Sequence, residues 1–227
     1  MIRLDEKVVM ITGATGGLGQ TVTSVFSKVG ATIVLVHRKT HTMLQEGVLG
    51  FTADVTDEAD VQRLVAEVKQ KTNRIDCLIN LVGGFATGRL AETTVSDWSK
   101  MLTLNLTAAF LLSRAVVPFM VAQGAGRVIH IGARAAVEPF PGAGAYIVSK
   151  SGLAALIKVL ALELAGSGVK VNGVLPTIID TPANRQNMPA ADYTHWVKPE
   201  SIAQLLVLLA SDEAPAINGA LIPIGST

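Results

Sequence analysis

The stretch VVMITGATGGLGQ, residues 8–20, decides the fold of this chain. Its first five residues, Val8–Thr12, predict a buried strand, and the glycine-rich turn after them leads into a helix expected over Gly17–Val29. Glycines let a backbone turn sharply and approach a pyrophosphate, while the helix N-terminus offers N–H groups to its oxygens. The spacing departs from G-x-G-x-x-G because Thr15 stands at the second glycine, so a glycine-rich turn without a ligand remains an alternative.

The rest of the chain alternates short apolar runs with longer helical patterns. Further strands are expected at Thr32–Val36, Gly50–Ala53, Cys77–Leu81, Arg127–Ile131, Lys170–Leu175 and Ala220–Ile224. Helices are expected after a cap at Thr56 and over Ser96–Met120, Gly144–Ala165 and Pro199–Leu209. This alternation predicts one α/β domain over residues 1–227, a Rossmann-type doubly wound parallel sheet of about seven strands with helices on both faces. Ligands of such folds bind beyond the carboxyl ends of the strands.

The composition narrows the function to a globular enzyme or binding protein. Hydrophobic residues make up 49% of the 227 residues and the net charge is +1, which gives no electrostatic reason to expect a nucleic acid or a membrane surface as partner. No unbroken apolar run reaches the ~18 residues of a membrane span, and the charged N-terminus does not resemble a signal peptide, so we expect a cytoplasmic protein. Cys77 is expected to be a buried hydrophobic residue, and no metal site is expected from His37, His41, His130 and His195.

The end of the second predicted strand bears on the choice between NAD and NADP. A carboxylate at this position would hold the ribose 2′-OH and repel a 2′-phosphate. This chain has His37 there, followed by Arg38 and Lys39, and a guanidinium can bind a phosphate through two hydrogen bonds. We therefore predict a preference for NADP(H), with NAD(H) as a possible substitute. An ordinary solvated loop is the alternative interpretation of the two cations.

Tyr146 and Lys150 are spaced for acid–base chemistry. They are four residues apart, so on a helix they lie on one face about one turn apart. A reductase needs a proton donor that faces the substrate as hydride arrives on the neighbouring atom. A tyrosine with a pKa of ~10 serves poorly at neutral pH, and a nearby ammonium group lowers that pKa. A tyrosine and a surface lysine without a catalytic role are the alternative.

Taken together, these residues resemble the short-chain dehydrogenase/reductase superfamily over the whole length of the chain. Thr12-Gly-x-x-x-Gly17-x-Gly19 is similar to the nucleotide-binding signature of that family, and Tyr146-x-x-x-Lys150 to its catalytic pair. The resemblance implies that Tyr146 donates the proton, that Lys150 also bonds to the nicotinamide ribose, and that Asn105 helps to hold a water in the proton relay.

The same resemblance implies a set of cofactor-binding residues. It assigns Asp54 to the adenine, the residues after the fourth strand to the adenosine, and the loop that begins at Pro176 to the nicotinamide amide, with Thr177 in place of a glycine. Besides Tyr146 and Lys150, the set consists of Gly13, Thr15, Gly16, Gly17, Leu18, Gly19, His37, Arg38, Asp54, Val55, Asn80, Val82, Gly83, Pro176, Ile179 and Thr181.

One position departs from the family pattern. The usual serine lies thirteen residues before the tyrosine, and here that position is Ala133. Losing such a hydrogen-bond donor can lower a rate on the order of 10²-fold. Alanine there, with the stretch from Asp180 to Trp196, resembles the quinonoid dihydropteridine reductases. That resemblance implies a substrate pocket with Phe85, Ala133 and Trp196, although simple packing is an alternative for the two aromatic residues.

Three functions follow as hypotheses. The leading one is reduction of a quinonoid dihydropterin or another small activated substrate by NAD(P)H. The second is a general carbonyl or 3-oxoacyl reductase in which a water or Thr87 replaces the missing serine, and the third is an NADP-sensing protein with little catalysis. Related proteins form dimers through their two long helices, so we also expect a dimer or tetramer through Ser96–Met120 and Gly144–Ala165.

Overall fold

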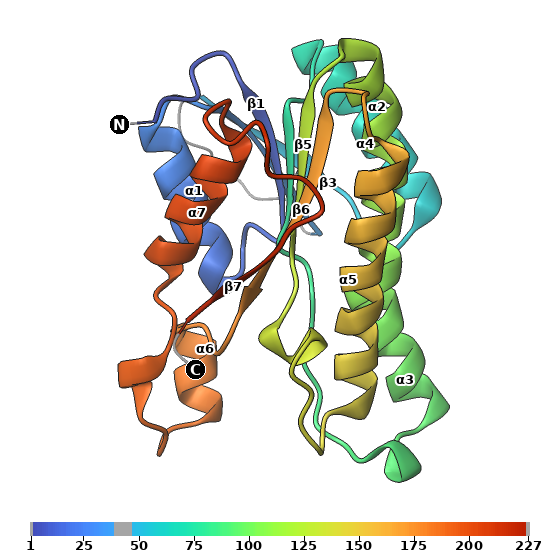
Figure 1. Cartoon of the computed structure of the whole chain (residues 1–227), viewed down its shortest axis with the longest axis vertical. Helices are drawn as coiled ribbons and strands as arrows, with labels where there is room; N and C mark the ends of the chain where they lie inside the picture. The colour runs from blue at the N-terminus through green and yellow to red at the C-terminus, as the bar shows by residue number, and fades with distance from the viewer. Residues whose placement is uncertain (1, 39–46, 226–227) are drawn as a thin grey trace.

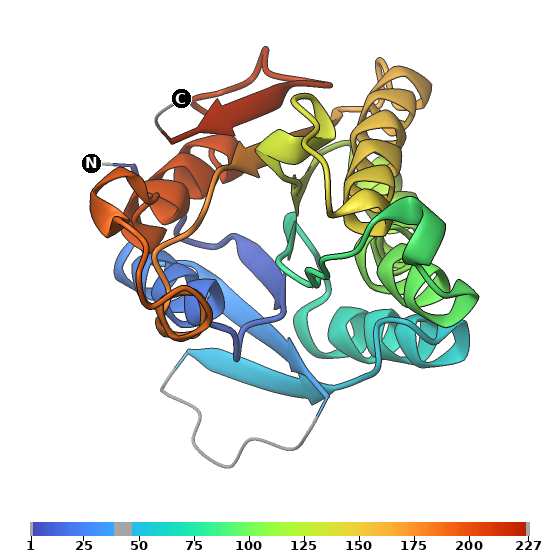
Figure 2. The same ribbon diagram turned by 90° about the horizontal axis from the view of Figure 1, so that it is seen from below.

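A parallel sheet of seven strands forms the centre of the molecule. The structure is a computed structural model that describes residues 2–38 and 47–225. The strand order is β3-β2-β1-β4-β5-β6-β7, and every neighbouring pair runs parallel (Figures 1 and 2). The order reverses between β1 and β4, which is where ligands of doubly wound sheets bind. The predicted fold class is confirmed.

Each expected strand is present, and its bounds lie within two residues of the prediction. The apolar runs in the middle of the sheet are buried on both faces, as parallel strands under two layers of helices must be, whereas the two edge strands are partly exposed. The strands are β1 Val8–Thr12, β2 Thr32–His37, β3 Val48–Thr52, β4 Cys77–Asn80, β5 Gly126–Ile131, β6 Val169–Pro176 and β7 Leu221–Ile224.

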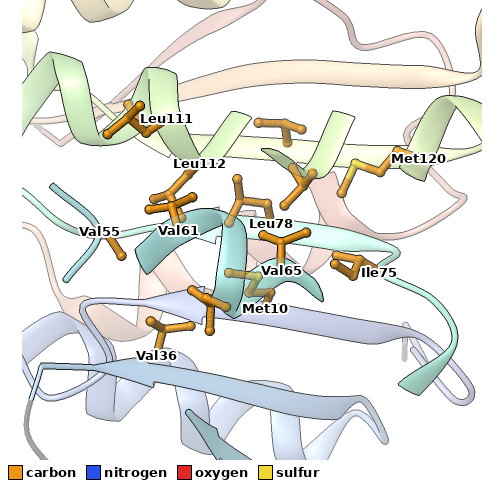
Figure 3. Packing of buried hydrophobic residues seen from close by; sticks show 14 of the residues in the cluster. Met10, Val36, Val55, Val61, Val65, Ile75, Leu78, Leu111, Leu112 and Met120 are labelled. Atoms are coloured by element: carbon orange, nitrogen blue, oxygen red, sulfur yellow. The ribbon is translucent and has the colours of Figure 1, made fainter. Parts of the chain in front are cut away.

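The helices form two layers. α1 (Gly17–Lys28) and α7 (Pro199–Ala210) cover one face of the sheet, and α2 (Glu58–Thr72), α4 (Ala108–Gln123) and α5 (Gly144–Glu163) cover the other (Figure 1). Alternate residues along the strands serve the two layers. On β1, for example, Val9 and Ile11 face α1 and α7, while Met10 packs with Leu78 and Val65 under the second layer (Figure 3).

Two local predictions were wrong, and a third missed a turn inside a helix. Asp57 rather than Thr56 caps α2, because its side chain accepts the N–H of Asp60 whereas the Thr56 hydroxyl bonds to Asp54. The long helix predicted over Ser96–Met120 is present as one helical stretch, Val95–Gln123, in which a π-helical turn at Thr103–Thr107 joins α3 (Val95–Leu102) to α4. A short helix, α6 (Pro182–Asn187), stands in a stretch for which we predicted no helix.

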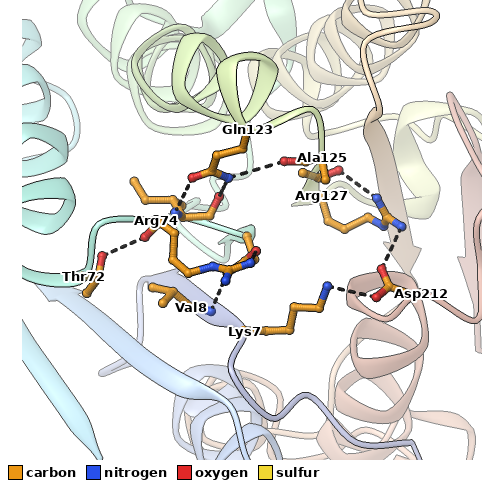
Figure 4. Close-up of polar contacts among 11 residues, drawn as sticks. Lys7, Val8, Thr72, Arg74, Gln123, Ala125, Arg127 and Asp212 are labelled. Atoms are coloured by element: carbon orange, nitrogen blue, oxygen red, sulfur yellow. Dashed lines mark hydrogen bonds and ion pairs between the residues drawn. The ribbon is translucent and has the colours of Figure 1, made fainter.

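Polar side chains hold together the amino ends of the strands, opposite the ligand-binding edge. The Asp76 carboxylate accepts the backbone N–H of Val8 at 2.8 Å and also pairs with Arg74. Asp212 lies 2.9 Å from Lys7 and 3.4 Å from Arg127, which joins the start of β1 to β5 and the end of α7 (Figure 4). These contacts stabilise the amino edge of the sheet and leave the carboxyl edge for function.

Two helical stretches are long and apolar enough to span a membrane by length and composition alone. They are Val95–Gln123 and Gly144–Glu163, each with a mean hydropathy of 1.6, and 44% of each apolar window is buried in the structure. Both pack against the sheet with one face (Figure 1), as core helices of α/β proteins do.

Candidate active site

The glycine turn after β1 lies close to two other loops at the carboxyl edge. Gly13 has a φ of +73°, and a Cβ there would come within 3.1 Å of the Val82 backbone nitrogen. A Cβ on Gly17 would lie 2.9 Å from the Cβ of Thr181, in the loop after β6. Thr15, Gly16 and Gly17 are exposed, and α1 begins without a side-chain cap, so no capping side chain occupies its first N–H groups. A backbone cradle of this kind suits the phosphates of a dinucleotide. The next two residues of the turn, Leu18 and Gly19, are buried beneath it.

The ends of β2 and β3 bring Arg38 close to Asp54. The hydrogen bond from the Thr56 hydroxyl to the Asp54 carboxylate lowers the pKa of that carboxyl, and the nearby positive charge of Arg38 lowers it further. His37 is buried and Arg38 is exposed. Val55 is buried beside them. Lys39 and His41 lie outside the described residues.

Asn80, at the end of β4, connects the first two loops. Its Oδ1 accepts the Thr12 hydroxyl at 2.7 Å and the Val82 N–H at 3.1 Å. Solvent exposure increases along the loop after β4: Asn80 is buried, Val82 is half-buried and Gly83 is exposed.

Asn105 holds the loop after β4 against the catalytic helix. It lies in the π-helical turn and is buried. Its Oδ1 accepts the Gly84 N–H at 2.9 Å, and its Nδ2 donates to the Gly84 carbonyl and to the Ser149 hydroxyl, both at 3.0 Å. Ser149 in turn donates to the Tyr146 carbonyl at 2.6 Å. Sequence reasoning missed Ser149, although its place between Tyr146 and Lys150 was a usable signal.

Lys150 points inward from α5 and meets the end of β5. Its Nζ donates to the Ile131 carbonyl at 2.8 Å, and a Cβ on Gly83 would lie 3.1 Å from that Nζ. Burial lowers the pKa of Lys150 to about 8 and raises the pKa of Tyr146 to about 12. The expectation that Lys150 lowers the pKa of Tyr146 is not met in this structure, because the loss of hydration around the phenol dominates.

The wall beside Tyr146 is apolar. Ala133 is buried in a cluster with Ala135, Ala143 and Ile147, and Tyr146 packs against this cluster. Phe85 approaches from the other side, with its ring centroid 4.9 Å from that of Tyr146 and an edge-on angle of 79°. Because Phe85 is 59% exposed, its ring is open to a small molecule. The structure therefore brings Phe85, Ala133 and Tyr146 together.

The segment from Asp180 to Trp196 folds on itself beyond β6. Thr181 caps α6 by accepting the Asn184 N–H at 3.2 Å, and the Arg185 guanidinium forms two hydrogen bonds with Asp180. Trp196 is almost buried and its ring lies 4.6 Å from that of Tyr193. Pro176 ends β6, and Ile179 forms a bridge to Val197. These contacts favour packing as the role of Trp196, in contrast to the exposed Phe85.

Among residues 2–38 and 47–225, no group of three or more His, Cys, Asp and Glu side chains is arranged to hold a metal ion. The buried Cys77 behaves as the sequence predicted, and burial raises the pKa of its thiol.

Comparison with known proteins identifies the family. The sequence model of the short chain dehydrogenases matches residues 7–192. The chain belongs to the short-chain dehydrogenase/reductase family. This membership makes it an NAD(P)-dependent oxidoreductase, in agreement with its parallel seven-stranded sheet.

Several relatives extend over nearly the whole chain. A 3-oxoacyl-[acyl-carrier-protein] reductase of Thermotoga maritima is 32% identical, covering 98% of each chain. A D-threitol dehydrogenase of Mycolicibacterium smegmatis is 34% identical, covering 96% of this chain and 91% of the relative. The crystal structure of a putative short-chain dehydrogenase/reductase from Burkholderia xenovorans superposes with a TM-score of 0.90 at 31% identity, covering 99% of this chain and 97% of the other.

Proposed function

We propose that this enzyme uses NADPH to reduce a small, conjugated and readily reduced substrate, such as a quinonoid dihydropterin, with Tyr146 as proton donor. The observation that carries the proposal is Ala133. It is buried in the apolar cluster beside Tyr146, at the position where the family has a serine hydroxyl. A substrate that accepts hydride easily depends less on that hydrogen bond than an isolated ketone does.

The residues around the glycine turn fit a dinucleotide. The turn from Gly13 to Gly19 would hold the pyrophosphate, Asp54, Val55, Asn80, Val82 and Gly83 the adenosine side, and Pro176, Ile179 and Thr181 the nicotinamide. When bound there, the cofactor supplies the hydride. The backbone cradle at Gly13 and Gly17, which a Cβ would fill, supports this assignment.

The preference for NADPH rests on Arg38. Its guanidinium is exposed at the end of β2, where a dinucleotide of this fold presents its adenosine ribose. No carboxylate stands at position 37 to repel a 2′-phosphate. Asp54 lies near Arg38, but its carboxylate already accepts two hydrogen bonds from Thr56. These bonds keep the carboxylate within its own loop.

Tyr146 is protonated at neutral pH because burial raises its pKa to about 12, so the phenol has a proton to donate. Lys150 carries most of its charge at pH 7, with a pKa of about 8. As negative charge develops on the substrate, the Lys150 ammonium would stabilise the phenolate left on Tyr146. Through its hydrogen bonds to Gly84 and Ser149, Asn105 would hold the loop after β4 in a fixed position relative to α5 while the proton moves.

Phe85 would place the substrate. Its exposed ring, fixed edge-on against Tyr146, offers a flat apolar surface at the entrance of the site. A planar conjugated ring could stack on this surface and bring its reducible bond toward the phenol.

A second candidate is reduction of an ordinary carbonyl or of a 3-oxoacyl group. The full-length likeness to a 3-oxoacyl-[acyl-carrier-protein] reductase favours it. In that reaction a water or Thr87 would have to supply the hydrogen bond that Ala133 cannot make.

Oxidation of NADPH with a panel of substrates tests the proposal. We expect turnover with quinonoid dihydropterin and with activated quinones at a kcat/KM well above that for aliphatic ketones and 3-oxoacyl thioesters. The reverse order would establish the carbonyl reductase instead. Cofactor binding without turnover of any substrate would contradict both activities and favour a sensor.

We also propose that two copies associate through α4 and α5. Both helices carry large apolar side chains on the side that faces away from the sheet, where nothing covers them within the described part of the chain. These side chains are Phe110, Val121, Val148, Val159 and Leu162, with exposed fractions from 41% to 77%. Large exposed apolar side chains gathered on two helices of one layer are typical of a self-association face.

A further inference from the structure

A row of buried polar side chains crosses three strands at the carboxyl edge of the sheet. Thr12, Asn80 and His130 occupy paired positions on β1, β4 and β5, so their side chains point to the same face. They lie above Met10, Leu78 and Val128 of the apolar layer that α2 and α4 cover. All three are buried, as is Ser113 on α4, which His130 reaches.

The direction of every hydrogen bond in this row follows from its two ends. At one end a backbone N–H, that of Val82, can only donate, so the Asn80 atom that it meets must be the carbonyl oxygen. The amide nitrogen of Asn80 therefore faces His130, 3.3 Å from Nδ1, and donates to it.

At the other end, the Ser113 hydroxyl donates its proton to the Ala109 carbonyl at 2.7 Å. Its oxygen, 3.0 Å from His130 Nε2, must then accept. The two ends agree on one tautomer of His130, with the proton on Nε2 and a free lone pair on Nδ1. Burial and the positive charge of Lys150 lower the pKa of His130 to about 3, so the imidazole remains neutral.

We infer that His130 is a positioning residue that fixes the amide of Asn80 in the one orientation that holds both cofactor-binding loops. The single Oδ1 of Asn80 accepts from Thr12, next to the glycine turn, and from Val82, next to Gly83. A reversed amide would turn its NH2 group toward these two donors and its oxygen toward the lone pair of Nδ1. The chain of bonds thus runs from the backbone of α4 to the cofactor loops. This inference rests on the proposed cofactor site.

The tautomer can be measured directly. We expect the ¹⁵N spectrum of histidine-labelled protein to show His130 neutral and protonated at Nε2 at pH 7. A proton on Nδ1, or on both nitrogens, would overturn the inference. This experiment needs no cofactor, so it stands apart from the proposed function.

The effect on the cofactor is tested with His130→Phe. We expect the dissociation constant for NADPH to rise about tenfold, because a buried amide loses the partner that orients it. The kcat at saturating NADPH should stay within about twofold, since Tyr146 and Lys150 are untouched. The matched control is Ile129→Val, one position earlier on β5 with its side chain on the opposite face, which should leave the dissociation constant unchanged.

An unchanged dissociation constant in His130→Phe, or an equal rise in Ile129→Val, would overturn the inference. Should His130→Phe fail to fold, Ser113→Ala serves instead. It removes only the acceptor of the Nε2 proton and leaves that buried N–H without its partner, so we expect weaker binding of NADPH. A wild-type protein that binds neither NADPH nor NADH would overturn the cofactor site on which the inference rests.

Discussion

The ring of Phe85 meets the ring of Tyr146 edge-on, with the centroids 4.9 Å apart. This contact joins the loop after β4 to the catalytic helix α5, directly beside the apolar cluster that contains Ala133. The phenol is thus surrounded by apolar groups on two sides. The relationship explains the raised pKa of Tyr146, and it leaves the exposed ring of Phe85 beside the phenol.

Ala133→Ser should restore the missing hydrogen-bond donor. We expect kcat/KM for simple ketones to rise by about tenfold or more, because a hydroxyl beside Tyr146 can stabilise charge that develops on a carbonyl oxygen. Steady-state kinetics with a ketone panel measures the effect. Ala135→Ser, in the same buried cluster, is the matched control and should leave ketone reduction unchanged. Equal rates in wild type and Ala133→Ser would mean that the pocket does not bring a carbonyl to this position.

Arg38→Gln should weaken the binding of NADPH more than the binding of NADH. The guanidinium is expected to bind the 2′-phosphate, and the loss of such a charge-assisted contact raises the KM for NADPH by about tenfold or more. The KM for NADH, which lacks that phosphate, should change little. Arg3→Gln, in the segment that precedes β1, is the control for a lost surface cation. A wild-type enzyme that clearly prefers NADH would contradict the assignment.

Lys150→Met should change how stability depends on pH. Lys150 has a pKa of about 8 in the folded protein, below its ordinary value of 10.5. Between these two values the unfolded chain binds a proton that the folded chain does not, so this residue adds stability as the pH rises. From pH 7.5 to 10 the free energy of unfolding of the wild type should gain about 2 kcal/mol relative to Lys150→Met. Denaturant titrations at several pH values measure this difference, and parallel curves for the two proteins would contradict it.

Leu162→Glu should disrupt self-association. Leu162 is 77% exposed on α5 and belongs to the outward apolar face of α4 and α5. Burying a carboxylate against apolar side chains costs more free energy than the contact contributes, so light scattering should show a smaller species. Glu163→Gln, on the next residue, is the control. A monomeric wild type would refute the proposed association.

Much of the site could be predicted from the sequence because its parts follow strands. The glycine turn, Asn80, Asp54 and the tyrosine–lysine pair all lie at the carboxyl edge, which a parallel sheet requires. The apolar runs predict the strand bounds to within two residues. They do so because helices cover both faces of the sheet, so its strands appear in the sequence as continuous apolar runs.

Other features depend on tertiary contacts that a sequence pattern does not contain. A π-helical turn around Asn105 has nearly the same apolar spacing as an α-helix, so the pattern predicts one straight helix. α6 has only six residues, too few for a periodicity, although Thr181 followed by Pro182 is a start signal. The pKa of Tyr146 rises because apolar neighbours partly bury its ring, which the four-residue spacing to Lys150 does not predict.

The central claim is that Tyr146 donates the proton in an NADPH-dependent reduction. It is tested most directly by the kcat of Tyr146→Phe for oxidation of NADPH with quinonoid dihydropterin. Removing a positioned acid costs roughly 10²- to 10⁴-fold, so we expect kcat to fall by at least about a hundredfold while NADPH binds as before. Tyr193→Phe is the control. The hydroxyl that it removes donates to the backbone carbonyls of Met188 and Pro189, so this variant should retain its kcat. A Tyr146→Phe enzyme as active as the wild type would contradict the account.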